Sequence, residues 1–303
     1  MTLTQLKYII TVAESGSMNE AAKKLFVAQP SLSAAVKDLE AEIGIELFRR
    51  SNRGISLTPK GQEFMGYARQ VVEQYQLMES RYVTKETVKK KFSVSMQHYT
   101  FAVKAFVEMV KQFGMDEYEF AVYETSTHEV IANVRDFKSE IGILYLDEFN
   151  RRVLMKLFQE YHLEFHELLT CGIYVYMWKG HPLAGGQEIS LEELKEYPCL
   201  SFEQGEHNSF YFAEEVLSTY EYKRLIKASD RATLLNLMVG LNGYTLCSGI
   251  ICEELNGEEY CAVKLKTEDK MSIGYLVRKG VSISELGQKY LEEVRKFRDK
   301  GMN

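Results

Sequence analysis

The feature that most limits what this chain can fold into is a break between two short amphipathic segments in SMNEAAKKLFVAQPSLSAAVKDLEAEIGIELF, residues 17–48. Ser17 and Glu20 form a capping-box pattern, which predicts a short helix from Met18. After FVAQ, Pro30 suits the first position of another helix, where its missing N–H costs nothing, and Gly44 ends that helix. The sequence therefore predicts two helices joined by a tight turn, the second opening with small polar residues.

Further signals flank this pair of helices. Apolar residues recur at helical spacing from Leu3 to Ala13, and two β-like runs around 51–54 predict a hairpin, or wing. Thr58-Pro59 opens a long helix with roughly heptad-spaced apolar residues, a stripe that usually pairs with its own copy when it lies outside a core. The stripe comprises Phe64, Ala68, Val71, Val72, Tyr75, Met78 and Tyr82. We predict a winged helix-turn-helix over 1–58 and a linker (dimerisation) helix over 59–91.

The distribution of charge supports a nucleic-acid partner for this part of the chain. The whole chain has a net charge of −6, but residues 1–91 carry 14 Lys and Arg against 10 Asp and Glu, a net +4. The remaining residues net −10. The basic first third favours double-stranded DNA as its partner, which the whole-chain charge would hide.

Candidate DNA contacts follow from this arrangement. The first turn of the second helix can reach base edges and phosphates, with its N–H groups as an anion site, and basic wing residues can supply sequence-independent affinity. The alternative is a small bundle that serves only protein contacts. The candidates are Gln29, Pro30, Ser31, Ser33 and Lys37 on the helix and Arg49, Arg50 and Arg53 on the wing.

At this point the sequence resembles a known family. LKYIITVAESGSMNEAAKKLFVAQPSLSAAVKDLEAEIGIELFRRSNRGISLTPKGQEF, residues 6–64, is similar almost position by position to the LysR-type transcriptional regulators. The resemblance implies promoter DNA as a partner, a homodimer or homotetramer, a long linker helix and a C-terminal effector domain like the periplasmic binding proteins; RNA polymerase is a further expected partner. One departure is Ala34-Ala35, where many members carry Arg or Gln, because alanine can only pack on a thymine methyl.

From residue 92 the pattern changes to strands alternating with helices, which predicts a parallel α/β domain. We expect an effector-binding domain over 92–303, with subdomain I at 92–163 and 269–303 and subdomain II at 164–268. The fold class is therefore α/β with an all-α, winged N-terminal part, and the strands are expected at 92–96, 118–124, 140–146 and 171–178. The resemblance is looser here, with GHPLAG and MVGLNGYTLCSG as its landmarks.

Hydroxyl and amide side chains follow several of these strands. In open α/β domains ligands bind at the C-terminal ends of strands, where the next helices offer N–H groups. We therefore expect a small-molecule effector, an anionic metabolite, in the cleft between the subdomains, although Ser and Thr are also ordinary helix caps. The candidates are Ser95, Gln97 and Thr100; Thr125, Ser126 and Thr127; and Ser201, Thr245 and Ser248.

Other kinds of site find less support. His162, Glu164 and His166 could form a metal trio, but alternation with apolar residues favours an exposed strand, so no metal is expected. Cys247 and Cys252 could sense redox state, yet no basic residue adjoins either one, and the five cysteines lack CxxC spacing. The sequence contains no catalytic motif, which disfavours an enzyme, and we expect no cofactor.

The setting of the protein follows from what the sequence lacks. There is no secretory signal pattern and no apolar run long enough to cross a membrane, and the cysteine pattern suits a reducing compartment. We therefore expect a cytoplasmic protein without a membrane partner. A solute-binding or carrier protein that uses the α/β domain is the alternative, against which the basic N-terminal third and the absent signal argue.

Overall fold

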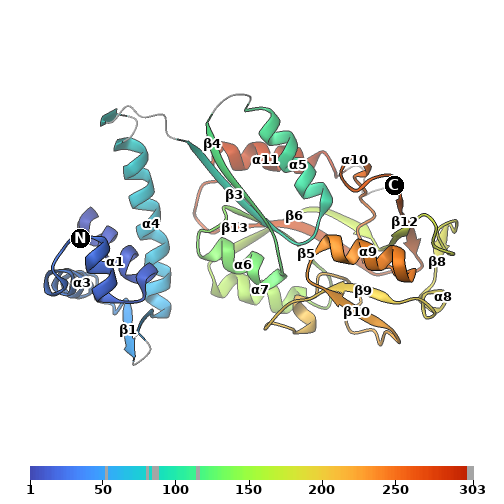
Figure 1. Ribbon diagram of the computed structural model, residues 1–303, viewed down its shortest axis with the longest axis horizontal. Coiled ribbons are helices and arrows are strands. Elements are labelled where there is room, and N and C mark those ends of the chain that lie inside the picture. The colour runs from blue at the N-terminus through green and yellow to red at the C-terminus, as the bar shows by residue number, and fades with distance from the viewer. Residues whose placement is uncertain (52–53, 80–81, 84–88, 114–116, 299–303) are drawn as a thin grey trace. The chain divides into compact units, whose positions relative to one another are not determined.

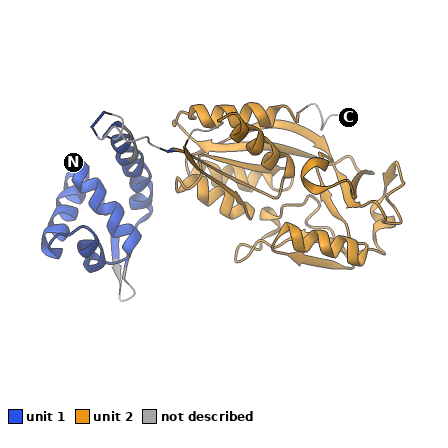
Figure 2. Cartoon of the chain, turned by 45° about the horizontal axis from the view of Figure 1, so that its top comes forward, with its two compact units in different colours: residues 1–89 blue, residues 90–303 orange. Residues whose placement is uncertain are grey.

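The computed structural model describes residues 1–51, 54–79, 82–83, 89–113 and 117–298. The chain divides into two compact units, residues 1–89 and 90–303 (Figure 2). The division lies two residues before the expected end of the linker helix at 91.

The first unit contains the expected helices and hairpin in the expected order. They are α1 (Leu3–Ser15), α2 (Met18–Lys24), α3 (Gln29–Ile43), β1 (Phe48–Ser51), β2 (Gly54–Leu57) and α4 (Pro59–Glu79). Ser17 caps α2 by accepting a hydrogen bond from the Glu20 N–H. The sequence predicted Pro30 as the first residue of the next helix. Helix α3 instead starts at Gln29, so Pro30 is its second residue. Gly16 and Gly44 end α1 and α3 in the left-handed conformation, which glycine adopts without strain.

Helix α3 and the wing are fixed to the rest of the unit by polar contacts. The Glu40 carboxylate on α3 accepts the backbone N–H groups of Leu47 at 2.7 Å and Phe48 at 3.2 Å, at the start of the wing. The Ile55 N–H on the other wing strand donates to the Gly16 carbonyl at 2.9 Å. A Cβ on Gly61 would lie 2.1 Å from the Leu47 carbonyl oxygen, so only glycine allows α4 to approach this closely. These contacts fix the angle between α3 and the wing.

The apolar residues of α4 divide between two faces. Ala68 and Val72 are buried with Met65 against the core that α1, α2 and α3 share. Val71 and Met78 are about half exposed, at 51% and 55%. The expected stripe therefore serves the unit's own core on one side and leaves apolar side chains on the other.

The second unit begins with a five-stranded sheet in the order β4-β3-β5-β13-β6 (Figure 1). Strands β3, β4 and β5 are parallel, whereas β13 runs antiparallel to both of its neighbours, so the sheet is mixed and not wholly parallel as predicted. The strands are β3 (Lys90–Met96), β4 (Tyr118–Glu124), β5 (Ile141–Leu146), β6 (Leu163–Gly172) and β13 (Lys270–Arg278).

Helices cover both faces of this sheet. We call the sheet and its helices subdomain I (90–172 and 270–298). The helices are α5 (Thr100–Lys111), α6 (Thr127–Arg135), α7 (Arg151–Glu160) and α11 (Glu285–Arg295). Strand alternation divides β5 between two cores: Ile141, Ile143 and Tyr145 join the core that includes α5 and α11 residues, and Leu144 and Leu146 join that of α6 and α7. Gly142 lies so close to α6 that a Cβ would be 2.9 Å from Val130.

Subdomain II (173–269) has a four-stranded sheet in the order β11-β7-β12-β8 and a parallel pair, β9 and β10. A bridge between Cys199 and Tyr244 joins the two. Its elements are β7 (Tyr174–Trp178), β8 (Glu188–Ile189), α8 (Leu191–Leu194), β9 (Cys199–Phe202), a 3₁₀ turn (Phe210–Phe212), β10 (Leu225–Ala228), α9 (Arg231–Leu241), β11 (Thr245–Cys247), α10 (Glu253–Asn256) and β12 (Tyr260–Leu265).

Two features of the second unit differ from the sequence prediction. Residues 171–178 were expected to form one strand, but β6 ends at Gly172 in the first sheet and β7 starts at Tyr174 in the second. The whole of β6 pairs with β13, so subdomain I extends to Gly172 and not to the predicted boundary at residue 163. Helix α7 was not predicted, although Leu154 and Phe158 bury one face of it at helical spacing.

Candidate functional site

The first turn of α3 presents a polar surface. Pro30, Ser31 and Lys37 are exposed, whereas Gln29 and Ser33 are half-buried. The N-cap residue is Ala28, whose side chain has no hydrogen-bond acceptor for the first-turn N–H groups. These N–H groups and the Ser31 hydroxyl are hydrogen-bond donors at the start of the helix, and the Lys37 ammonium is a further donor in its middle; contacts to phosphate or base edges require such donors.

The wing supplies positive charge beside this helix. Arg49 is exposed on β1, opposite Ser56 of β2, and Arg50 pairs with Ile55 in the same ladder. The Arg50 side chain and the whole of Arg53 lie outside the described residues. Of the eight predicted DNA contacts, the structure therefore describes six with their side chains.

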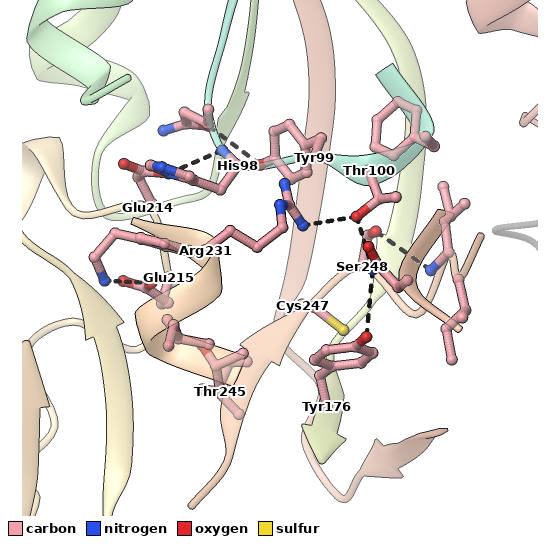
Figure 3. Close-up of a pocket in the computed structure, with 18 of the residues that line it drawn as sticks. His98, Tyr99, Thr100, Tyr176, Glu214, Glu215, Arg231, Thr245, Cys247 and Ser248 are labelled. Carbon is pink, nitrogen blue, oxygen red and sulfur yellow. Dashed lines mark hydrogen bonds and ion pairs between the residues drawn. The ribbon is translucent and has the colours of Figure 1, made fainter. Parts of the chain in front are cut away.

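A cavity of about 90 Å³ lies between subdomains I and II of the second unit (Figure 3). Its subdomain I wall is the turn that joins β3 to α5, and its subdomain II wall comes from β7, β9, α9 and β11 and the segments after them. Apolar side chains such as Phe101, Leu234 and Leu246 form much of the lining. The lining residues with polar side chains are Gln97, His98, Tyr99, Thr100, Tyr176, Glu214, Glu215, Arg231, Thr245, Cys247, Ser248 and Asn256.

Four of the nine predicted effector residues line this cavity: Gln97, Thr100, Thr245 and Ser248. The Thr100 hydroxyl accepts hydrogen bonds from Arg231 Nη1 at 2.7 Å and Asn256 Nδ2 at 3.0 Å. The Ser248 hydroxyl accepts the Ile250 N–H at 3.4 Å. The Thr245 hydroxyl is different: it is buried, and it has no hydrogen-bond partner among the described residues. Thr245 is therefore a polar group available to a ligand.

The other five predicted effector residues lie outside the cavity lining, and three of them, Ser95, Ser126 and Thr127, have side-chain hydrogen bonds within the protein. Ser95 is fully buried between Ser139 and the Asn133 amide, at 2.7 and 2.9 Å. Ser126 caps α6, accepting the Glu129 N–H at 3.4 Å. None of the five lines the cavity: Ser95, Thr125, Ser126, Thr127 and Ser201.

Thr127 and Gln97 belong to one buried polar network beside the cavity. The Thr127 hydroxyl accepts a hydrogen bond from the Gln97 amide, and the Gln97 carbonyl oxygen accepts the Tyr145 N–H at 3.0 Å and the Tyr99 hydroxyl at 3.2 Å. The Thr127 N–H, at the start of α6, donates to Gln204 Oε1 at 3.0 Å. This helix start is therefore already satisfied by a side chain from subdomain II.

Several cavity residues were not predicted from the sequence. Arg231, the first residue of α9, forms an ion pair with Glu124 of β4 in subdomain I and also binds Thr100. His98 lies parallel to the Phe202 ring at 3.6 Å between centroids, and its Nδ1 lies 2.7 Å from Glu214 Oε2. Arg231 follows the strand β10 within a few residues, so the rule that found Thr100 could have found it. Glu214 lies in an irregular segment and offers no such signal.

Burial controls the protonation of two groups here. Burial, with the neighbouring Glu214 carboxylate, raises the pKa of Glu215 well above its ordinary value of 4.5, which favours the neutral form of this carboxyl. Burial also raises the pKa of the Cys247 thiol to about 12. A thiol with this pKa is a poor nucleophile, which argues against Cys247 as a redox sensor. Cys252, the other candidate, is buried.

The structure separates the proposed metal trio. His162 precedes β6 in the left-handed conformation, with φ 53°, so it does not continue the alternation of Glu164 and His166 along the strand. His166 stacks on Tyr275 with 4.9 Å between ring centroids. Within the described parts of the chain, no three His, Cys, Asp or Glu side chains gather as metal ligands would. Nor does any described helix have the length and apolar character that a membrane span needs.

Comparison with known proteins identifies both units. Residues 3–62 match the model of the bacterial regulatory helix-turn-helix proteins of the lysR family, and residues 98–298 match the LysR substrate binding domain. The regulator TcbR of Pseudomonas sp. (strain P51) is 48% identical over 73 residues, which are 24% of this chain and 25% of TcbR. This chain thus spans about a quarter of that relative's length.

Other similarities extend over more of the chain. The regulator CysL of Bacillus subtilis (strain 168) is 27% identical over 217 residues, 71% of this chain and 69% of CysL. Full-length OxyR from Pseudomonas aeruginosa has a similar fold, with a TM-score of 0.58 at 21% identity, covering 98% of this chain and 94% of that one. TcbR and CysL are both named as HTH-type transcriptional regulators. With a substrate-binding-domain match over most of its length and a helix-turn-helix match at its start, the chain belongs to the LysR family of bacterial transcriptional regulators.

Proposed function

We propose that α3 binds the major groove of promoter DNA and that the wing contacts the adjacent backbone. The observation that carries this proposal is the exposed start of α3, where the Ser31 hydroxyl accompanies N–H groups that no N-cap side chain satisfies, with the exposed Lys37 further along the same helix. Gln29, Pro30 and Ser33 complete the reading edge, and Arg49, Arg50 and Arg53 supply phosphate contacts. Ala34 is exposed on the same helix and can contribute only apolar contact to a thymine methyl.

We propose further that the chain acts as a homodimer or homotetramer in the cytoplasm and engages RNA polymerase at its promoters. The exposed side chains of Tyr67, Val71 and Met78 on α4 support self-association, because a second copy of the helix would remove them from water. Two copies of α3 would then read two half-sites related by the symmetry of the dimer.

The cavity between the subdomains is proposed as the site of a small-molecule effector. It has an apolar lining, a few convergent polar groups and the unpaired Thr245 hydroxyl, which are the features of a ligand site. Side chains from both subdomains form its walls. A ligand that binds one arrangement of the subdomains better than another shifts the balance between them, and this shift is the signal to the DNA-binding unit.

The salt dependence of DNA binding tests the first proposal. We expect the affinity of the full chain for duplex DNA to fall steeply with salt, and Lys37→Ala to reduce the slope of log affinity against log salt by about 0.9 if Lys37 meets one phosphate. Lys156→Ala, which removes an exposed lysine from α7, is the matched control and should leave the slope unchanged. A slope near zero for the wild type, or equal slopes for wild type and Lys37→Ala, would count against this docking.

A further inference from the structure

One segment of subdomain II, residues 202–215, crosses to subdomain I and forms one side of the cavity region. We call it the bridging segment. The Phe202 ring stacks on His98, and the Ala213 carbonyl accepts the Tyr145 hydroxyl at 3.2 Å. Tyr211 of the same segment stacks on Phe149 of subdomain I, with 4.6 Å between ring centroids. The bridging segment therefore contacts subdomain I at several separate points.

Two side chains of the bridging segment occupy the helix starts at which the sequence predicted an anion. Glu214 Oε2 accepts the His98 N–H at 3.1 Å, ahead of α5, and lies 2.7 Å from the His98 imidazole Nδ1. Gln204 Oε1 accepts the Thr127 N–H at the start of α6. Gln204 Nε2 donates to Glu214 Oε1 at 2.9 Å, so the two side chains support each other. The backbone N–H donors of His98, just ahead of α5, and of Thr127, at the start of α6, are therefore already engaged by side chains of the protein.

Glu214 is a buried side chain at the contact between the subdomains. Its side chain is only 4% exposed, and that of His98 is 8% exposed (Figure 3). A buried carboxylate requires hydrogen-bond donors to both of its oxygens, which His98 and Gln204 supply. Glu214 is thus bound as a ligand carboxylate would be, but it is covalently part of the chain.

In the part of the chain that the structure describes, each basic side chain of the cavity lining already has an acidic partner. Among the described residues that line the cavity, the basic side chains are His98 and Arg231. His98 faces Glu214, and Arg231 forms its ion pair with Glu124. A negatively charged ligand would enter beside the Glu214 carboxylate and find both basic groups engaged.

We propose that Glu214 is a built-in carboxylate which occupies the anion position of the cleft, so that the effector of this protein carries no negative charge. This proposal rests on the proposed function of the cavity as the effector site, and it replaces the anionic effector expected from the sequence. The unpaired Thr245 hydroxyl and the apolar lining fit a small uncharged molecule with one or two hydrogen-bonding groups. A cavity that holds benzene measures about 150 Å³, so the cavity as it stands takes a smaller molecule than benzene.

Acetate tests whether the anion position exists and whether Glu214 fills it. Thermal unfolding of the full chain is followed by the fluorescence of Trp178, the single tryptophan, in sodium acetate and in sodium chloride of equal concentration. In Glu214→Ala the His98 donors are vacant, and acetate is expected to bind there. With a dissociation constant of about 10 mM, about 100 mM acetate raises the ratio of folded to unfolded chain about 11-fold. The midpoint then rises by about 3 to 6 °C relative to chloride.

The controls separate this effect from general effects of the salt. Glu206→Ala removes an exposed carboxylate from the same bridging segment and should respond to acetate as the wild type does. Glu214→Gln keeps the position filled by an amide and should show no acetate-specific rise. No acetate-specific rise in Glu214→Ala, or an equal rise in Glu206→Ala, would overturn the proposal.

The wild-type chain gives a second measurement that does not depend on the folding of any variant. Acetate should leave its midpoint where chloride leaves it, and an acetate-specific rise in the wild type overturns the proposal by itself. The readout is the stability of the second unit and not DNA binding. If the chain failed to bind promoter DNA, the proposed regulatory function would be refuted and the acetate result would still stand. A negative acetate result would refute only the proposed role of Glu214.

Discussion

Arg231 on α9 of subdomain II binds Glu124 and Thr100 of subdomain I, and its removal has a calculable effect on stability. Its guanidinium forms a fork-like ion pair with the Glu124 carboxylate and donates a third hydrogen bond to Thr100. The two side chains are 24% and 27% exposed, so the pair is partly shielded from solvent. Opposite charges at this range attract by about 4 kcal/mol at an effective dielectric constant of 20, before desolvation is subtracted.

We expect a net coupling of about 2 kcal/mol between Arg231 and Glu124, the range of hydrogen bonds to charged groups. A double-mutant cycle of Arg231→Ala and Glu124→Ala measures it, with urea unfolding of the full chain followed by Trp178 fluorescence, which reports on the second unit. Arg231→Lys keeps the charge but loses the planar fork, so it should lose about half of the coupling.

The exposed pair Lys156–Glu160 on α7 is the matched control. Its side chains are 79% and 57% exposed, and such pairs contribute at most about 0.5 kcal/mol. If the coupling between Arg231 and Glu124 is no larger than that of the control pair, the ion pair does not join the subdomains in solution and the reasoning fails.

Three further predictions concern the cavity. Thr245→Val replaces the unpaired hydroxyl with a methyl group and should raise the free energy of unfolding by about 1 kcal/mol in urea titrations; a loss of stability would mean that the hydroxyl is paired. The raised pKa of Glu215 means that the folded chain holds a proton which the unfolded chain releases, so stability should fall as the pH rises above about 4.5. Glu215→Gln should flatten this dependence and be more stable than the wild type near neutral pH, by urea titrations across pH. Because burial raises the pKa of Cys247 to about 12, iodoacetamide near neutral pH should label it, by mass spectrometry, only after unfolding.

Local signals in the sequence were sufficient for the elements of the first unit. Gly16 and Gly44 end helices through their own left-handed conformation, and Ser17 caps α2 by accepting the N–H of Glu20, three residues along the chain. Each of these effects acts within one helical turn, so one short stretch of sequence contains all of it. The start of α3 was misplaced by one residue because Pro30 is tolerated at either of the first two positions.

The cavity could be predicted only in part, because its main contacts join residues far apart in sequence. Thr100 and Thr245 follow from the rule that polar residues after strands meet ligands. Glu214, however, binds His98 from 116 positions along the chain, and Arg231 binds Glu124 from 107. A strand–helix pattern does not show which distant side chain lies at a helix start. The sequence therefore predicted the anion position but not that Glu214 fills it.

The crossing between sheets at Ile173 was missed for a related reason. Apolar residues continue through Cys171, Ile173 and Val175 without a break, and all three are buried in one core. The alternation of apolar residues indicates that a strand is buried but does not indicate which sheet it joins. Only the pairing of β6 with β13 and of β7 with β12 separates the two strands.

Selection of binding sites from random duplex DNA tests the central claim, that the first turn of α3 reads promoter sequence. The full chain should enrich one motif with two related half-sites, and Ser31→Glu, which places a carboxylate at this turn, should bind the enriched site at least about tenfold more weakly. Ser282→Glu adds the same charge to an exposed position of the second unit and serves as the control. Equal affinity of the wild type and Ser31→Glu for the enriched site, or no enriched motif at all, would contradict the account.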